Sequence, residues 1–166
     1  MLRSEIKSRV RSQESGVRTT KSQMKIWYNK ELKISDFSHW MKNTMGETLG
    51  MEIIELGDDF LKMKMPVDHR THQPYGLLHG GASVALAETA GSICSALVID
   101  HDHFIALGVE INANHIRSAR EGFVYAHCKP VNLGSTIHVW DIRITDENGK
   151  LICISRLTVA IRTRPE

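Results

Sequence analysis

The residues with the clearest chemical potential lie in one short motif and one isolated carboxylate. The motif spans residues 73–83 and reads Gln-Pro-Tyr-Gly-Leu-Leu-His-Gly-Gly-Ala-Ser. Glu88 follows the motif and is the one charged residue among the small and apolar residues 80–98. Backbone N–H groups at a helix N-terminus have no partner within the helix, so the N–H of Gly80 can polarise a carbonyl. Because burying an unpaired carboxylate is costly, we interpret Glu88 as a functional acid that can attack such a carbonyl.

The spacing of Gly80 and Glu88 limits how they can cooperate. They are eight residues apart, and a helix rises 1.5 Å per residue, so they lie about 12 Å apart along the axis. One carbonyl cannot contact both groups of the same helix. Either they serve different purposes, or two copies of the helix lie antiparallel and form two composite sites in a homodimer. Ser92, one helical turn after Glu88, can hydrogen-bond the carboxylate or a nearby water.

Other polar clusters give weaker signals. The histidines at residues 68–72 and 101–103 lie in turn-like loops without the spacing of a zinc site, and no metal is predicted. No dinucleotide-binding, P-loop or serine-hydrolase motif is present in the sequence. His115, at the end of a strand, is interpreted by itself as a structural histidine. The basic cluster at residues 117–122 is either a solvated turn or a phosphate-binding loop.

Composition describes an ordinary globular chain. It has 166 residues, of which 42% are apolar and 24% charged, enough for one domain with a real core. Three widely spaced cysteines, Cys94, Cys128 and Cys153, are interpreted as buried small hydrophobes in a reducing compartment, with a redox or metal role as the alternative. No apolar run reaches the roughly 18–20 residues that a bilayer requires.

Charge divides the chain unevenly. Residues 1–24 carry six bases and two acids, and residues 25–166 carry 15 bases and 17 acids. The first segment is predicted to be a disordered basic tail, with a targeting segment or a start assigned too far upstream as alternatives. The second is predicted to be the folded domain. Its mild negative charge offers no electrostatic case for binding nucleic acid.

Hydrophobic periodicity predicts an α+β fold. A short helix is expected from Ser35, with Ser35 or Asp36 as N-cap and with Phe37, Trp40, Met41 and Met45 on one face. Residues 51–56 and 60–65 are predicted to form a hairpin, and residues 80–98 a long buried helix. Four strands follow at residues 104–116, 123–131, 136–145 and 151–162, and Asn148-Gly149 joins the last two. This order predicts a curved antiparallel sheet wrapped around one helix.

Three motifs resemble one known family. Residues 73–83 with Glu88, residues 108–115 (Gly-Val-Glu-Ile-Asn-Ala-Asn-His) and residues 118–122 (Ser-Ala-Arg-Glu-Gly) are similar to the PaaI-like acyl-CoA thioesterases of the hotdog fold. The similarity covers about residues 24–163. It is greatest to the 1,4-dihydroxy-2-naphthoyl-CoA hydrolases of menaquinone biosynthesis, with the proofreading thioesterases of enterobactin synthesis close to them. The resemblance implies a long helix wrapped by a sheet, a homodimer or a dimer of dimers, and no cofactor or metal.

The resemblance also implies roles for individual residues. Glu88 is then the nucleophile or the general base, while the Gly80 N–H polarises the thioester carbonyl. Gln73 and His79 hold the thioester or the water, and Ser92 assists near Glu88. Further implied contacts are His115 at the acyl group, and Arg117, Ser118, Arg120 and Ser135 at the CoA moiety. Thr136 stands where some relatives carry an arginine, which puts one nucleotide contact in doubt.

The predicted function is therefore a cytoplasmic thioesterase that cleaves an aromatic acyl-CoA, of the hydroxynaphthoyl or hydroxybenzoyl type, into acid and CoA. One alternative is a broad-range thioesterase for aliphatic acyl-CoA or acyl-carrier-protein substrates. Another is a non-catalytic hotdog module that senses acyl-CoA. A regulator of that second kind needs a DNA-binding domain, for which the 24 residues before the predicted domain are too few.

Overall fold

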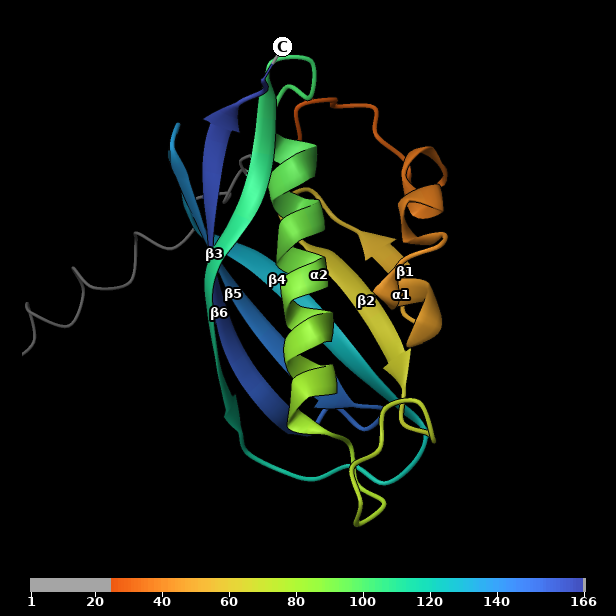
Figure 1. Ribbon diagram of the computed structural model, residues 1–166. Coiled ribbons are helices and arrows are strands. Elements are labelled where there is room, and N and C mark those ends of the chain that lie inside the picture. The colour runs from red at the N-terminus through yellow and green to blue at the C-terminus, as the bar shows by residue number, and fades with distance from the viewer. Residues whose placement is uncertain (1–24, 166) are drawn as a thin grey trace, which may run out of the picture.

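One long helix lies in the curve of a six-stranded antiparallel sheet (Figure 1). The computed structural model describes residues 25–165, so the predicted tail at residues 1–24 lies outside the described residues. The helix is α2 (Gly80–Val98), and the strand order in the sheet is β1-β2-β4-β5-β6-β3. The strands are β1 (Glu52–Leu56), β2 (Leu61–Pro66), β3 (Phe104–His115), β4 (Phe123–Leu133), β5 (Ile137–Asp146) and β6 (Leu151–Thr163). This is the predicted α+β hotdog architecture, with strand ends within two residues or so of those expected.

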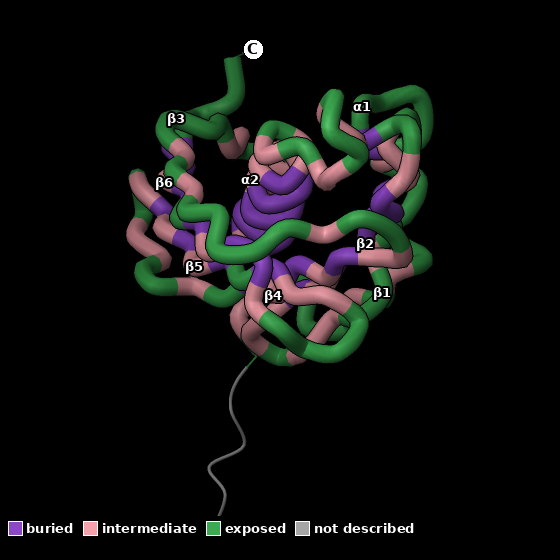
Figure 2. Tube along the Cα trace, turned by 90° about the horizontal axis from the view of Figure 1, so that it is seen from below, coloured by how far each residue is buried: buried purple, intermediate pink, exposed green. Residues whose placement is uncertain are grey.

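The central helix begins and ends where the apolar stretch does. His79 is its N-cap, and its Nδ1 accepts a hydrogen bond from the N–H of Gly81 at 2.8 Å. Among residues 25–165, α2 is the one helix whose length and hydropathy would suffice to cross a membrane. More than half of its residues in that stretch are buried inside the protein, where the strands curve around it (Figure 2). The apolar composition of α2 is therefore explained by its place in the core.

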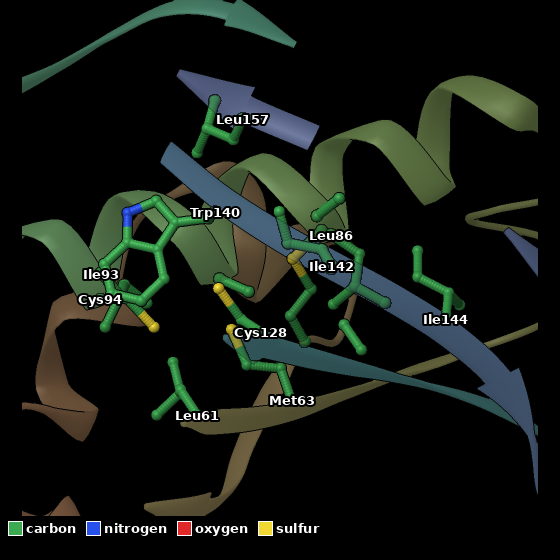
Figure 3. Packing of buried hydrophobic residues seen from close by; sticks show 14 of the residues in the cluster. Leu61, Met63, Leu86, Ile93, Cys94, Cys128, Trp140, Ile142, Ile144 and Leu157 are labelled. Atoms are coloured by element: carbon green, nitrogen blue, oxygen red, sulfur yellow. The ribbon is translucent and has the colours of Figure 1, made fainter. Parts of the chain in front are cut away.

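The core forms between α2 and the inward-facing side chains of the strands. In β2 and β5, fully buried residues alternate with more exposed ones, as the period of a strand requires. Figure 3 shows Met63, Cys128, Trp140 and Leu157 of four strands around the helix residue Leu86. All three cysteines are free and buried, in agreement with their interpretation as small hydrophobes.

The predicted helix from Ser35 is wrong. This segment forms two 3-10 turns, Ile34–Asp36 and Ser38–Met41, followed by the short helix α1 (Met45–Thr48). Asp36 does accept from a backbone N–H, but the donor is Lys33, which closes one tight turn. Phe37 is 1% exposed and anchors the segment in the core. The apolar spacing instead reflects the buried Phe37 and the side chains of Trp40, Met41 and Met45, which lie beside α2.

β3 lies at one edge of the sheet and is paired along its length with β6. It is twelve residues long, and a register shift between Gly108 and Glu110 marks a β-bulge at Val109. Leu107 and Val109 on this strand are 50% and 63% exposed. A long edge strand with exposed apolar side chains is a template for pairing with another chain.

Candidate active site

The N-terminus of α2 opens into a cleft that unites five of the predicted site residues. We call it the first cleft; its volume is about 400 Å³. The predicted residues in it are Gln73, Gly80, His115, Arg117 and Ser118. The remaining lining residues are Leu77, Leu78, Ser83, Ile116 and Ile152, of which Ser83 was not foreseen. Three segments that are distant in the sequence therefore meet at one helix end.

Two loops form the cleft, and hydrogen bonds hold them together. The N–H of Leu78, in the loop before α2, donates to the carbonyl of Ala119, in the loop after β3, at 2.8 Å. The Nε2 of His72 hydrogen-bonds the carbonyl of Arg120 at 2.9 Å. The first loop begins at Asp68, whose pKa is lowered to about 2, chiefly by a hydrogen bond from the Arg70 side chain. The loop is thus braced at its start and against its neighbour.

Hydrogen bonding at the helix start leaves one N–H for a ligand. The Gly81 N–H donates to the His79 ring, and the N–H groups of Ala82 and Ser83 donate to the His79 carbonyl at 3.0 and 3.3 Å. Within residues 25–165, no acceptor is recorded for the Gly80 N–H. A Cβ atom on Gly80 would stand 2.8 Å from Nε2 of His115. A side chain at this position would therefore displace the His115 ring from the helix terminus.

Glu88 and Ser92 lie in a different cleft, between α2 and the segment that precedes β1. We call it the second cleft; its volume is about 350 Å³. It is lined by Trp40, Met41, Thr44, Met45, Gly46, Ala85, Glu88, Thr89, Ser92 and Ile93. The Trp and Met residues of this lining were predicted to form a helix face, and nothing in the sequence indicated that they meet Glu88.

The carboxylate of Glu88 is less buried than the sequence suggested. It lies on the face of α2 that the sheet leaves open and is half-buried in the single chain. Its Oε1 lies over the backbone of β3, only 2.9 Å from where a Cβ atom of Gly108 would stand. The apolar neighbours in the sequence, such as Ala87 and Ala90, face the core instead. An acid in this position is open to a ligand or to a second chain.

Three other predicted residues are placed outside these clefts. Ser135 lines a third cleft at the C-terminal end of α2, together with Tyr28, Phe104 and His138. His79 and Arg120 are not among the residues that line the first cleft in the described part of the chain. His79 serves as the helix cap below the cleft, while the Arg120 carbonyl accepts from His72. Hence the structure does not bring Ser135 to the helix N-terminus.

The histidine-rich loops form no metal site in the described part of the chain. Within residues 25–165, no group of three or more His, Cys, Asp and Glu side chains could hold an ion. Their rings have other partners, because His103 hydrogen-bonds Asp100 at 2.9 Å and His101 packs edge-on against Trp40. The chemistry available at the clefts is therefore that of a carboxylate, hydrogen-bond donors and a helix terminus.

Comparisons with known proteins identify the family of this chain. A model of the thioesterase superfamily matches residues 75–153. The 1,4-dihydroxy-2-naphthoyl-CoA hydrolase of Escherichia coli (strain K12) is 54% identical over 124 residues, covering 72% of this chain and 90% of that protein. The proofreading thioesterase EntH of Cronobacter turicensis is 50% identical over 118 residues, covering 71% and 85%.

Solved structures extend the agreement to the fold. A mutant thioesterase from Pseudomonas aeruginosa superposes with a TM-score of 0.81 at 44% identity, covering 84% of this chain and 99% of that one. A thioesterase from Haemophilus influenzae gives a TM-score of 0.81 at 43% identity, covering 85% and 97%. The chain thus belongs to the thioesterase superfamily of the hotdog fold, and it is a thioester hydrolase.

Proposed function

We propose that this protein hydrolyses an aromatic acyl-CoA, of the hydroxynaphthoyl or hydroxybenzoyl type, to the free acid and CoA in the cytoplasm. The single observation that carries the proposal is the separation of Gly80 and Glu88 into two clefts on one apolar helix. The reaction then takes place between two protomers, where the first cleft of one faces the second cleft of the other. Each homodimer has two such composite sites.

The groups of the two clefts divide the reaction between them. The Gly80 N–H receives the thioester oxygen, where negative charge develops in the transition state. If the partner subunit's Glu88 is a general base, it takes a proton from water, and the hydroxide adds to the carbonyl carbon. The C–S bond then breaks, and the CoA thiolate takes up the proton that Glu88 had accepted from water. If Glu88 is the nucleophile, it forms a mixed anhydride and releases the thiolate, and water hydrolyses the anhydride.

The remaining residues of the first cleft fit roles in binding. Gln73 and His115 lie beside the Gly80 terminus, where they can orient the thioester. Arg117 and Ser118 line the cleft and are exposed, which suits them to bind the phosphates of CoA. The guanidinium of Arg117 already donates to the Leu151 carbonyl at 2.8 Å, so its position is fixed before a ligand binds.

The edge strand supports association of two copies. Among residues 25–165, the twelve-residue strand β3 pairs only with β6, which leaves its other edge open, with exposed Leu107 and Val109. Pairing of β3 with β3 of a second copy continues the sheet and covers both side chains. Glu88 lies over Gly108 of the same strand, so this association brings the carboxylate next to the partner. Two such dimers forming a tetramer would complete the assembly.

Relatives support both the substrate and the residues. The E. coli relative is named for a naphthoyl-CoA substrate. Two solved structures are variants of one Staphylococcus aureus protein, with alanine in place of a glutamate in one and of a glutamine in the other. In that protein the glutamine precedes the glutamate by 15 positions, as Gln73 precedes Glu88 here.

Substitution of Glu88 tests the mechanism. Glu88→Gln is expected to lower kcat by about 10²- to 10⁴-fold, the range typical of a lost general base, with the dimer intact by light scattering. Glu31→Gln, which removes an exposed carboxylate outside both clefts, is the matched control. Near-normal turnover of Glu88→Gln would overturn the assignment. A panel of hydroxynaphthoyl, hydroxybenzoyl and medium-chain acyl thioesters separates the aromatic substrate from the aliphatic alternative.

Mixed dimers test the composite site directly. Co-expressed Gln73→Ala and Glu88→Gln chains form heterodimers in which one of the two sites has both wild-type residues. Since half of the dimers are mixed at random, the mixture should recover about a quarter of wild-type activity. If one chain contained the whole site, the mixture would remain as inactive as its two parents.

A further inference from the structure

The second cleft has one wall that does not come from the sheet or from α2. Trp40, Met41 and Met45 reach it from the segment before β1, and Glu88, Ser92 and Ile93 face them from α2. Figure 1 shows this segment beside the helix, on the side of α2 opposite to β3. This segment precedes residues 75–153, the part of the chain that the superfamily model matches.

We propose that Trp40 determines the acyl specificity of the enzyme, by forming a rigid aromatic wall that selects a compact aromatic acyl group. The inference rests on the proposed function, because Glu88 marks the second cleft as the place of the reacting acyl group. Its volume of about 350 Å³ is near the lower end of ligand sites, which range from about 300 to 1,000 Å³. An aromatic ring on the wall of this cleft favours contact with a flat ring system of the acyl group.

The indole of Trp40 is held in place before a substrate arrives. Its ring packs against Phe37, with centroids 5.9 Å apart, and Phe37 is itself 1% exposed. On another side, the ring of His101 meets it edge-on at 5.4 Å. Trp40 is nevertheless 36% exposed, so part of its surface remains for a ligand. An aromatic surface fixed in this way favours ring-to-ring contact at little cost in side-chain entropy.

The neighbouring methionines adapt the wall to the ligand. Met45 is 60% exposed, and the end of Met41 lies against Gly46, where a Cβ atom would come within 2.1 Å of it. Thioethers are polarizable and pack well at the edges of aromatic rings. The turn that presents them is ordered by Thr44, whose hydroxyl donates to the Met41 carbonyl at 2.6 Å and accepts from the Gly46 N–H at 3.2 Å.

Steady-state kinetics with 2-naphthoyl-CoA and decanoyl-CoA test the inference. Trp40→Ala should lower kcat/KM for 2-naphthoyl-CoA about tenfold, mainly through KM, because the lost contact acts on ground state and transition state alike. Activity toward decanoyl-CoA should be unchanged or higher, since the cleft is enlarged. Trp40→Phe keeps an aromatic wall and should retain the naphthoyl preference. It also keeps the inference testable if the alanine variant misfolds.

The control is Ile54→Ala, which removes an apolar side chain of similar exposure, 38%, that does not line the cleft. It should leave the ratio of the two kcat/KM values unchanged. An equal loss toward both substrates in Trp40→Ala, or an unchanged ratio, would overturn the role of Trp40 while the thioesterase mechanism stands. Absence of turnover of every thioester by the wild-type protein would instead overturn the proposed function, and this inference with it.

Discussion

The contact between Glu88 and Gly108 allows the position of the carboxylate to be perturbed without changing the carboxylate itself. Gly108 lies on the inner face of β3, opposite Val159 of β6. A Cβ atom at this position would stand 2.9 Å from Oε1 of Glu88, whereas ordinary contacts begin at about 3.4 Å. The Gly108→Ala substitution therefore displaces the Glu88 carboxylate by roughly 0.5 Å or more.

The size of the expected effect follows from this displacement. A misplacement of about 1 Å in an active site can cost about 10²-fold in rate. We therefore expect Gly108→Ala to lower kcat/KM by about 10- to 100-fold, equivalent to about 1.4–2.7 kcal/mol of transition-state stabilisation. The glycine is not recorded among the residues with positive φ, so alanine fits the strand, and the melting temperature should change little.

The assay is hydrolysis of an aromatic acyl-CoA, measured by release of the free thiol, with light scattering to confirm that the variant has the same oligomeric state as the wild type. Glu88→Asp shortens the acid by one methylene, which relieves the clash with a methyl group at position 108. Gly108→Ala should then cost much less in the Glu88→Asp background than in the wild type. Ala106→Gly, a change of one methyl group on the same face of β3, is the control. Wild-type activity of Gly108→Ala, or an equal loss in both backgrounds, would refute the reasoning.

Three predictions concern stability. Ser95→Ala removes the acceptor of the buried Trp140 indole N–H, which donates to the serine at 2.7 Å, so the free energy of unfolding in urea should fall by about 1–3 kcal/mol; an unchanged value would contradict this. Burial lowers the pKa of His138 below its usual 6.5, and the unfolded state therefore binds a proton first as the pH falls. The stability of the wild type relative to His138→Gln should decline below about pH 6.5, and parallel pH curves would exclude this role. The Asp68 pKa of about 2, against an ordinary 3.8, means that its ionised form stabilises the fold above pH 3.8. The difference in melting temperature between wild type and Asp68→Asn should shrink as the pH falls to 2, and a constant difference would exclude the pairing with Arg70 as its cause.

Local patterns were sufficient for the regular elements. The apolar run over α2 and the alternation in β2 and β5 predicted the type of each element and nearly its first and last residues. The reason is that the spacing of apolar residues along the sequence reflects which faces of a helix or strand are buried. The prediction of a helix from Ser35 was wrong because it rested on apolar spacing alone. The spacing resembled that of a helix, but a tight turn closed by Asp36 and the burial of Phe37 fixed the backbone instead.

The sequence by itself determined the chemical groups, the helix that carries Gly80 and Glu88, and the separation that keeps them from meeting within one chain. These depend on residue type and on the fixed rise of a helix. Only the tertiary structure decided that Glu88 lies on the open face of α2, against Gly108, and that Trp40 faces it across a cleft. It also decided that Ser135 lies at the other end of the helix from the Gly80 terminus. Such placements depend on contacts between distant segments, which local periodicity does not encode.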